Sequence, residues 1–155
     1  MALVWRPGIW EDDGSSWYPL PKPVTGLDIS NRHDRTTHKV RGADGDIDTS
    51  PTLGPVTIRV RGVLSETGAG VVLVGHAAVD TEIAAFDSAA NGNATTRTFW
   101  FCEYYNSGDS YRFYKECKTV SLQFGKGNMI HSIPYVLVIK ASDPVRYAAS
   151  AGNLP

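Results

Sequence analysis

The sequence predicts a mainly β fold, an antiparallel β-sandwich or a partly closed barrel, with one flanking α-helix at about residues 76–90. Three observations lead to this prediction: stretches of alternating polar and apolar residues, turn dipeptides between them, and one stretch with helical spacing. A chain of 155 residues is long enough to bury a single hydrophobic core. We therefore expect one compact domain.

The N-terminal segment, residues 1–23, is expected to be an extended arm. It contains several prolines and no sustained period, and it carries Trp5, Trp10 and Trp17. Such an arm packs either on the domain's own surface or on a neighbouring subunit or partner, because tryptophan is enriched where surfaces meet.

Most of the segment between residues 24 and 142 has strand patterns. Residues 24–29 and 37–41 are short candidates, and Asp44-Gly45 favours a tight hairpin turn. Residues 56–64 alternate most cleanly, with valine, isoleucine and leucine on one face and Thr57, Arg59 and Arg61 on the other. We expect these residues to form a half-buried strand.

A helix is predicted where apolar residues recur with a period near 3.6. Val79, Ile83, Phe86 and Ala90 have this spacing, and Asn91-Gly92 supplies a stop signal. This helix would cover one face of the sheet.

A second hairpin is predicted around the polar connection at residues 106–109. If Tyr105 pairs with Ser110, Glu103 faces Arg112 and aromatic residues also face one another, so several favourable cross-strand pairs agree on this register. Cys117 then lies about 13 Å from Cys102 along the hairpin, too far for a disulfide. We therefore predict two free thiols.

Motifs for catalysis or ligand binding are absent from the sequence. Asp44, Asp46 and Asp48 have the spacing of a calcium loop, but Thr49 and Pro55 occupy its glycine and glutamate positions. Phosphate-loop, nucleophile-elbow and zinc-ligand patterns are also missing. We predict that the protein is not an enzyme and has no catalytic residue, no metal and no cofactor.

The charge of the chain argues against a basic nucleic-acid-binding domain. Charged residues are 20% of the sequence and the formal net charge is −1. Arg59 and Arg61, with Lys39 and Arg41 near them in sequence, are candidates for a basic stripe. The low net charge favours the interpretation that these side chains are solvated or paired with acids across the sheet.

The second hairpin carries bulky side chains on both faces, more than a monomer with one core needs. Together with the N-terminal arm, it is the predicted surface for subunit or partner contacts. The candidate interface residues are Trp5, Trp10, Trp17, Phe99, Phe101 and Tyr114.

The order of these patterns resembles the N-terminal belt domain of distal tail proteins of long-tailed bacteriophages, a family related to tail tube proteins. The resemblance rests on residues 39–45, residues 53–62, the helix with Ile83 and Phe86, the aromatic hairpin, and the strand at 135–139 that precedes Asp143-Pro144. The resemblance covers residues 24–145 and implies a belt domain there. The N-terminal arm at residues 1–23 has no counterpart in the family, and residues 146–155 are expected to form a loose C-terminal tail.

The resemblance also implies a function. Distal tail proteins are structural virion proteins, six copies of which form a ring that joins the tail tube to the hub and receptor-binding apparatus. The implied partners are other copies of the chain, the tail tube protein, and hub and tape measure proteins, with DNA only in transit and no membrane. The implied location is the tail tip of the virion, after assembly in the host cytoplasm. The alternatives are a tail tube or other minor tail protein of the same fold, and a monomeric ligand-binding β-sandwich.

Overall fold

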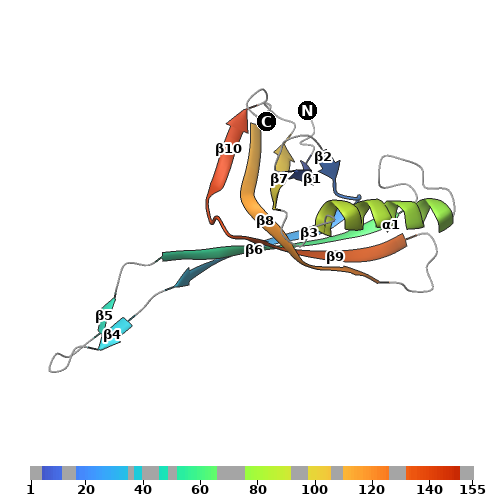
Figure 1. The fold of residues 1–155 in the computed structure, drawn as a ribbon. Coiled ribbons are helices and arrows are strands. Elements are labelled where there is room, and N and C mark those ends of the chain that lie inside the picture. The colour runs from blue at the N-terminus through green and yellow to red at the C-terminus, as the bar shows by residue number, and fades with distance from the viewer. Residues whose placement is uncertain are drawn as a thin grey trace.

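The computed structural model describes residues 5–11, 17–34, 37–39, 46–48, 52–65, 76–91, 98–105, 110–125 and 132–150 (Figure 1). Along the chain its elements are β1 (Trp5–Glu11), β2 (Trp17–Pro19), β3 (Val24–Asp34), β4 (Thr37–Lys39), β5 (Asp46–Asp48), β6 (Thr52–Ser65), α1 (His76–Asn91), β7 (Phe99–Tyr105), β8 (Ser110–Phe124), β9 (Ser132–Ala141) and β10 (Arg146–Ser150). The predictions of a mainly β fold and of a helix near residues 76–90 are confirmed.

The main sheet is antiparallel and has eight strands in the order β2-β1-β7-β8-β9-β6-β3, with β10 also paired to β8. Its two end strands, β2 and β3, are joined by the short segment 20–23. In this segment the Leu20 amide donates to the Pro7 carbonyl at 3.0 Å, and the Pro23 carbonyl accepts from the Val63 amide at 2.9 Å. In the described part of the chain β2 does not pair with β3, so the sheet is sandwich-like and not closed into a barrel.

The long strand β8 divides the sheet into two parts. Up to Cys117 it pairs with β7 and β10, and from Cys117 onward it pairs with β9. We call β2, β1, β7, β10 and the first part of β8 the aromatic half-sheet, and β3, β6, β9 and the second part of β8 the basic half-sheet. In Figure 1, β7, β10 and the first part of β8 stand upright from the plane of β6 and β9.

The predicted register of the second hairpin is confirmed between Tyr105 and Phe101, because Glu103 pairs with Arg112 and Phe101 with Tyr114. Beyond Phe101 the prediction is wrong, since a β-bulge places Cys117 opposite Phe99 and not opposite Thr98. Glu116 takes the positive φ of 50° at this bulge. Both cysteines are free and buried, as expected.

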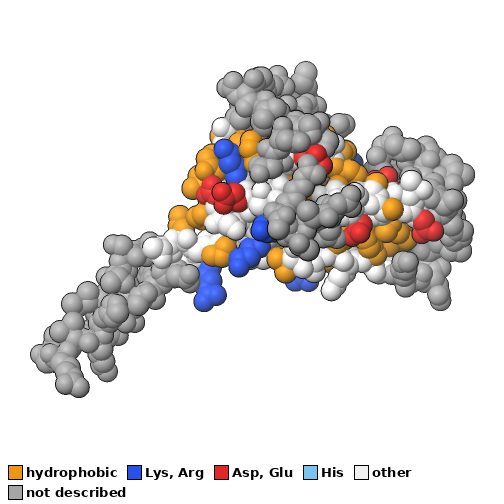
Figure 2. All heavy atoms as spheres, in the orientation of Figure 1, with side chains coloured by type: hydrophobic (Ala, Val, Ile, Leu, Met, Phe, Trp, Pro, Cys, Tyr) orange, Lys and Arg blue, Asp and Glu red, His pale blue; other side chains and the backbone are white. Residues whose placement is uncertain are grey.

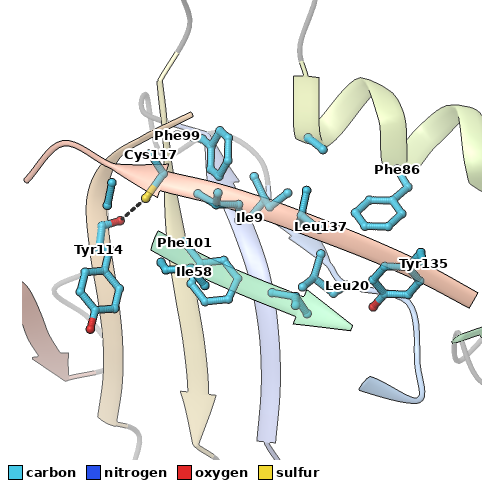
Figure 3. Close-up of a cluster of buried hydrophobic side chains, with 14 of the residues drawn as sticks. Ile9, Leu20, Ile58, Phe86, Phe99, Phe101, Tyr114, Cys117, Tyr135 and Leu137 are labelled. Carbon is cyan, nitrogen blue, oxygen red and sulfur yellow. Dashed lines mark hydrogen bonds between the residues drawn. The ribbon is translucent and has the colours of Figure 1, made fainter. Parts of the chain in front are cut away.

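The core lies inside the bend of the sheet and beneath α1 (Figure 3). Phe86 of α1 meets Tyr135 and Phe124 edge-on, with ring centroids 4.9 and 5.8 Å apart. The Tyr135 hydroxyl donates to the Pro21 carbonyl at 2.8 Å. Gly62 leaves room for this ring, because a Cβ there would lie 2.5 Å from the hydroxyl oxygen. The segment 20–23 is thereby fixed to the core.

The described residues before Val24 pack on the chain's own domain, which is one of the two alternatives expected for the N-terminal arm, but they form strands of the main sheet and contribute to the core. β1 pairs along the whole length of β7, and Ile9 and Leu20 are each only 2% exposed. The physical reason is that β7 is an edge strand without β1, and Ile9 completes the apolar face behind it. The expected loose tail is corrected for residues 146–150, because β10 pairs with β8 there; residues 151–155 lie outside the described residues.

The predicted hairpin near residue 45 has its two strands in place. β4 and β5 pair antiparallel in a separate two-stranded sheet, which lies beyond the ends of β3 and β6 and away from the core (Figure 1). Asp44 and Gly45 themselves lie outside the described residues.

Candidate functional site

Three of the six predicted interface residues are part of the core. Phe99, Phe101 and Tyr114 are 7%, 0% and 4% exposed and lie in the same cluster as Ile9 and Ile58 (Figure 3). The prediction that these three side chains contact a partner is therefore wrong. The prediction failed because β1 was not predicted as a strand. Without β1, the sequence did not indicate that Ile9 and the rest of the core pack against the inner face of the hairpin.

The three tryptophans of the N-terminal segment are partly exposed. Trp10 and Trp17 face each other across β1 and β2 with ring centroids 5.3 Å apart, and Trp10 pairs with Trp100 of β7. Trp5 lies at the first position of β1, opposite Tyr105. Trp10 and Trp17 thus begin a row of rings on the outer face of the aromatic half-sheet.

The row continues across the rest of this half-sheet. Trp100 stacks on Phe113 at 5.1 Å, and Phe113 stacks on Tyr147 at 5.6 Å. Lys115 lies over all three rings, closest to Tyr147 at 4.6 Å. Sequence reasoning did not include Phe113 or Tyr147 in the predicted interface, because their neighbours in space come from β7 and β10. We call Trp17, Trp10, Trp100, Phe113 and Tyr147 the aromatic row.

Two polar contacts hold β10 at the end of this row. Arg146 forms an ion pair of 2.5 Å with Glu103, whose side chain is almost fully buried. The Tyr147 hydroxyl donates to Asp143 at 2.7 Å, and this hydrogen bond is the main reason that the pKa of Asp143 lies below its ordinary value. Both contacts fix the orientation of side chains at the end of the row.

The basic half-sheet has two unlike free edges. Among the described residues, β3 pairs only with β6, and residues 118–124 of β8 pair only with β9. Side chains from Asp28 to His33 on β3 are exposed. On the other edge α1 approaches, and the Thr119 hydroxyl donates to the Ala90 carbonyl. Unpaired backbone groups on such edges can pair with another chain.

Other kinds of site find no support in the part of the chain that the structure describes. No group of three or more histidine, cysteine or acidic side chains there is arranged to hold a metal ion. No helix there has the length and apolar character needed to cross a membrane.

Solved phage-tail structures have a similar fold. The SPP1 Dit protein, described as a paradigm of the hub adsorption apparatus in phages that infect Gram-positive bacteria, matches with a TM-score of 0.55 and 15% identity, over 94% of this chain and 53% of that one. The SPP1 tail tube protein matches with a TM-score of 0.59 and 10% identity, over 94% and 76% of the two chains. A protein of the tail of an empty GTA particle, solved with C6 symmetry, matches with a TM-score of 0.50 and 11% identity, over 97% and 96%.

These similarities define the fold. The chain has the fold that distal tail and tail tube proteins share, as the sequence resemblance implied. It spans about half the length of the Dit protein. No protein-family model matches the sequence, and no curated protein does either.

Proposed function

We propose that this protein is a structural virion protein that forms a ring at the distal end of a phage tail tube. The ring would contain six copies, join the tube to the hub and receptor-binding apparatus, and allow DNA to pass through its bore. The observation that carries the proposal is the pair of free edges on the basic half-sheet, in a fold shared with tail proteins.

The two edges favour a ring because they differ from each other. An interface between β3 of one copy and β8 of the next is heterologous, and repeated heterologous contacts close into a ring when the rotation between copies allows it. Strand pairing across this interface would satisfy the backbone groups that each edge leaves open. A single chain cannot pair its own two edges, because β6 and β9 lie between them.

The aromatic row is the proposed contact surface for a different neighbour. Trp10 and Trp17 are half-exposed on the outer face, as is Trp100, and large rings of this kind anchor protein interfaces. Because the row lies on the other half-sheet, it remains accessible when β3 and β8 pair within a ring. We assign it to an adjoining component of the tail, either the tube protein or a hub protein. Trp5 lies on the other face of β1, that of Ile9, so we propose it only for a separate contact at the end of the strand.

The remaining partners and the location follow from the same proposal. A ring at the tube end would meet the tape measure protein and then DNA in transit, and it would lie at the tail tip after assembly in the host cytoplasm. This role is structural, so the protein would not be an enzyme.

The proposal is tested with two lysine substitutions at exposed apolar residues. Ile29 on the β3 edge is 36% exposed, and Val145 in the β9–β10 connection is 47% exposed. Ile29→Lys places a charge in the proposed interface and should abolish rings while the fold remains intact, whereas Val145→Lys should assemble like the parent. Light scattering and electron microscopy measure assembly, and circular dichroism melting measures folding.

Each outcome of this experiment has a meaning. Single rings of the parent that are lost only in Ile29→Lys support the proposal. Long tubes would instead support a tail tube subunit. A parent that stays monomeric at high concentration and also fails to bind isolated tail tubes would support the monomeric ligand-binding alternative. An Ile29→Lys variant that assembles like the parent would exclude the β3 edge from the interface.

A further inference from the structure

The basic half-sheet presents one broad face to solvent, on the side away from α1. Ile58, Leu137 and Ile139 point into the core and are fully buried, so their neighbours along β6 and β9 point outward. The outward-facing cations are Arg59, Arg61, Lys118 and Lys140, all with exposed side chains. We call these four residues the basic face. In Figure 2, Lys and Arg side chains gather along the lower margin of the molecule, beneath β6 and β9.

The positive charge on this face is only partly neutralised. Asp28 forms a salt bridge with Arg61, and Glu116 is exposed two residues before Lys118. Among the described residues, no salt bridge is formed by Arg59, Lys118 or Lys140. The sequence-based interpretation was that these arginines are solvated or paired with acids. Arg61 is paired with an acid, and Arg59, which lies opposite Asp28 in the register, is exposed to solvent.

Two of the unpaired cations are directly opposite each other. Lys118 of β8 and Lys140 of β9 are register partners, and like charges in directly opposed positions destabilise a sheet. On β6, Thr57 is the register partner of Lys140. Since the pair does not contribute to the stability of the chain alone, its arrangement points to an anionic ligand that lies across both strands.

The chemistry around the cations matches the backbone of nucleic acid. Ser30, Thr57, Ser121 and Gln123 lie on the same face and supply hydroxyl and amide groups of the kind that contact phosphate oxygens. The apolar residues of the face are valines, whereas the centre of a protein interface is depleted of charge and enriched in aromatic and methionine side chains. These features favour nucleic acid over an acidic protein.

We propose that the basic face binds the phosphate backbone of duplex DNA without reading its sequence. Four strands span about 14 Å, from three strand spacings of about 4.8 Å. Duplex DNA carries one charge per about 1.7 Å of its axis, so about eight phosphate charges fall within this length. Each unpaired cation can then contact a phosphate. No aromatic side chain lies on the described part of this face, so bases have no surface on which to stack.

The inference does not rest on ring assembly, because a single chain carries the whole face. With three or four phosphate contacts, the binding constant should fall with salt at a slope of about −3 on a log–log scale. Between 50 and 200 mM salt this is a loss of roughly sixtyfold. Such weak, screened contact is compatible with DNA that moves past the face.

The test measures binding of a fluorescein-labelled 20-base-pair duplex by fluorescence anisotropy at 50 mM salt and above. The parent should bind with the stated salt slope. Lys140→Glu should weaken binding about tenfold and reduce the magnitude of the slope by about 1. Lys118→Glu should have a similar effect, and it keeps the test informative if Lys140→Glu fails to fold.

The matched control is the double variant Ala84→Glu and Ala85→Glu on the exposed side of α1. It changes the net charge by the same amount as Lys140→Glu but lies on the opposite side of the sheet (Figure 1). It should bind DNA within about twofold of the parent, since charges more than a Debye length apart are largely screened. The proposal is overturned if the parent does not bind the duplex, if the control loses as much affinity, or if poly-glutamate binds as tightly as DNA.

Discussion

The two half-sheets share strand β8 but differ in what their outer faces offer. In the aromatic half-sheet both faces carry rings, so that Phe101 packs in the core and Trp100 stacks outside it. In the basic half-sheet the inner face is equally apolar, but the outer face carries cations and both edges lack a strand partner among the described residues. One sheet can therefore combine a half that is stabilised by packed aromatic side chains with a half that presents charged side chains and unpaired strand edges.

Deletion of the N-terminal strands should have the largest effect on the aromatic half-sheet. Deletion of residues 1–20 removes Ile9 and Leu20 from the core and uncovers the edge of β7. The two side chains alone contribute about 4–10 kcal/mol, comparable to the whole stability of a typical domain. The deleted chain should lose its cooperative melting transition by circular dichroism. A truncated chain that melts like the parent would restore the interpretation of these residues as a separate arm.

Two glycines allow the packing of the half-sheets to be compared directly. A Cβ on Gly8 would lie 2.4 Å from the Trp17 ring and 2.8 Å from the Tyr18 carbonyl oxygen, whereas a Cβ on Gly26 has no neighbour nearer than 3.8 Å. Gly8→Ala should lower the free energy of unfolding by about 1–3 kcal/mol. Gly26→Ala should change it by less than about 0.5 kcal/mol. Urea denaturation measures both, and equal effects would contradict the difference in packing.

The buried thiols of the aromatic half-sheet predict sensitivity to alkaline pH. Burial raises the pKa of both Cys102 and Cys117 to about 12. Thiols in the unfolded chain ionise near pH 9, so the folded state is progressively less favoured as the pH rises above this value. Between pH 9 and 10 the loss is about 1 kcal/mol per thiol.

The melting temperature followed over this pH interval checks the prediction. The slope should become shallower in Cys102→Ala, which removes one of the titrating groups. At neutral pH, a thiol reagent should label no cysteine in the native protein and two after denaturation. Rapid labelling of the native protein would contradict the burial of both thiols.

The smallest predicted effect is in the basic half-sheet and separates stability from binding. Lys118→Glu replaces a like-charge pair with an opposite-charge pair against Lys140, which stabilises a sheet by about 0.2–1 kcal/mol. The melting temperature should therefore rise slightly while DNA affinity falls. A variant in which the melting temperature and the DNA affinity both fall would indicate that Lys118 has a structural role instead.

The features that the sequence predicted well are those with short-range or paired signals. The helix follows from four apolar residues at helical spacing, and the hairpin register follows from Glu103 opposite Arg112. These signals depend only on residues that are close in the chain. Free thiols were predicted as well, although the bulge changed the partner of Cys117.

The features that the sequence hid depend on long-range pairing. Pro7 and Gly8 interrupt the polar–apolar alternation of β1, so the sequence does not predict this strand. The small residues after Arg146 have no strand pattern of their own, and they form β10 only because β8 is there to pair with them. Because the sequence does not predict β1 as a strand, Phe99 and Phe101 of β7 lack an expected cover and are predicted as interface residues. The bulge carries no glycine signal, since the positive φ falls on Glu116. The basic face could not be predicted from the sequence, because its residues come together only through the register of four strands.

Disulfide trapping between copies tests the ring most directly. Asp28→Cys on β3 and Gln123→Cys on β8 place exposed thiols on the two free edges, while the native cysteines stay buried. After mild oxidation, the double variant should give a ladder on a non-reducing denaturing gel that ends sharply at a closed ring, at six copies if the ring is hexameric. Asp28→Cys alone should give nothing larger than a dimer. A double variant that also stops at the dimer, although its thiols react freely with a labelling reagent, would contradict ring formation through these edges.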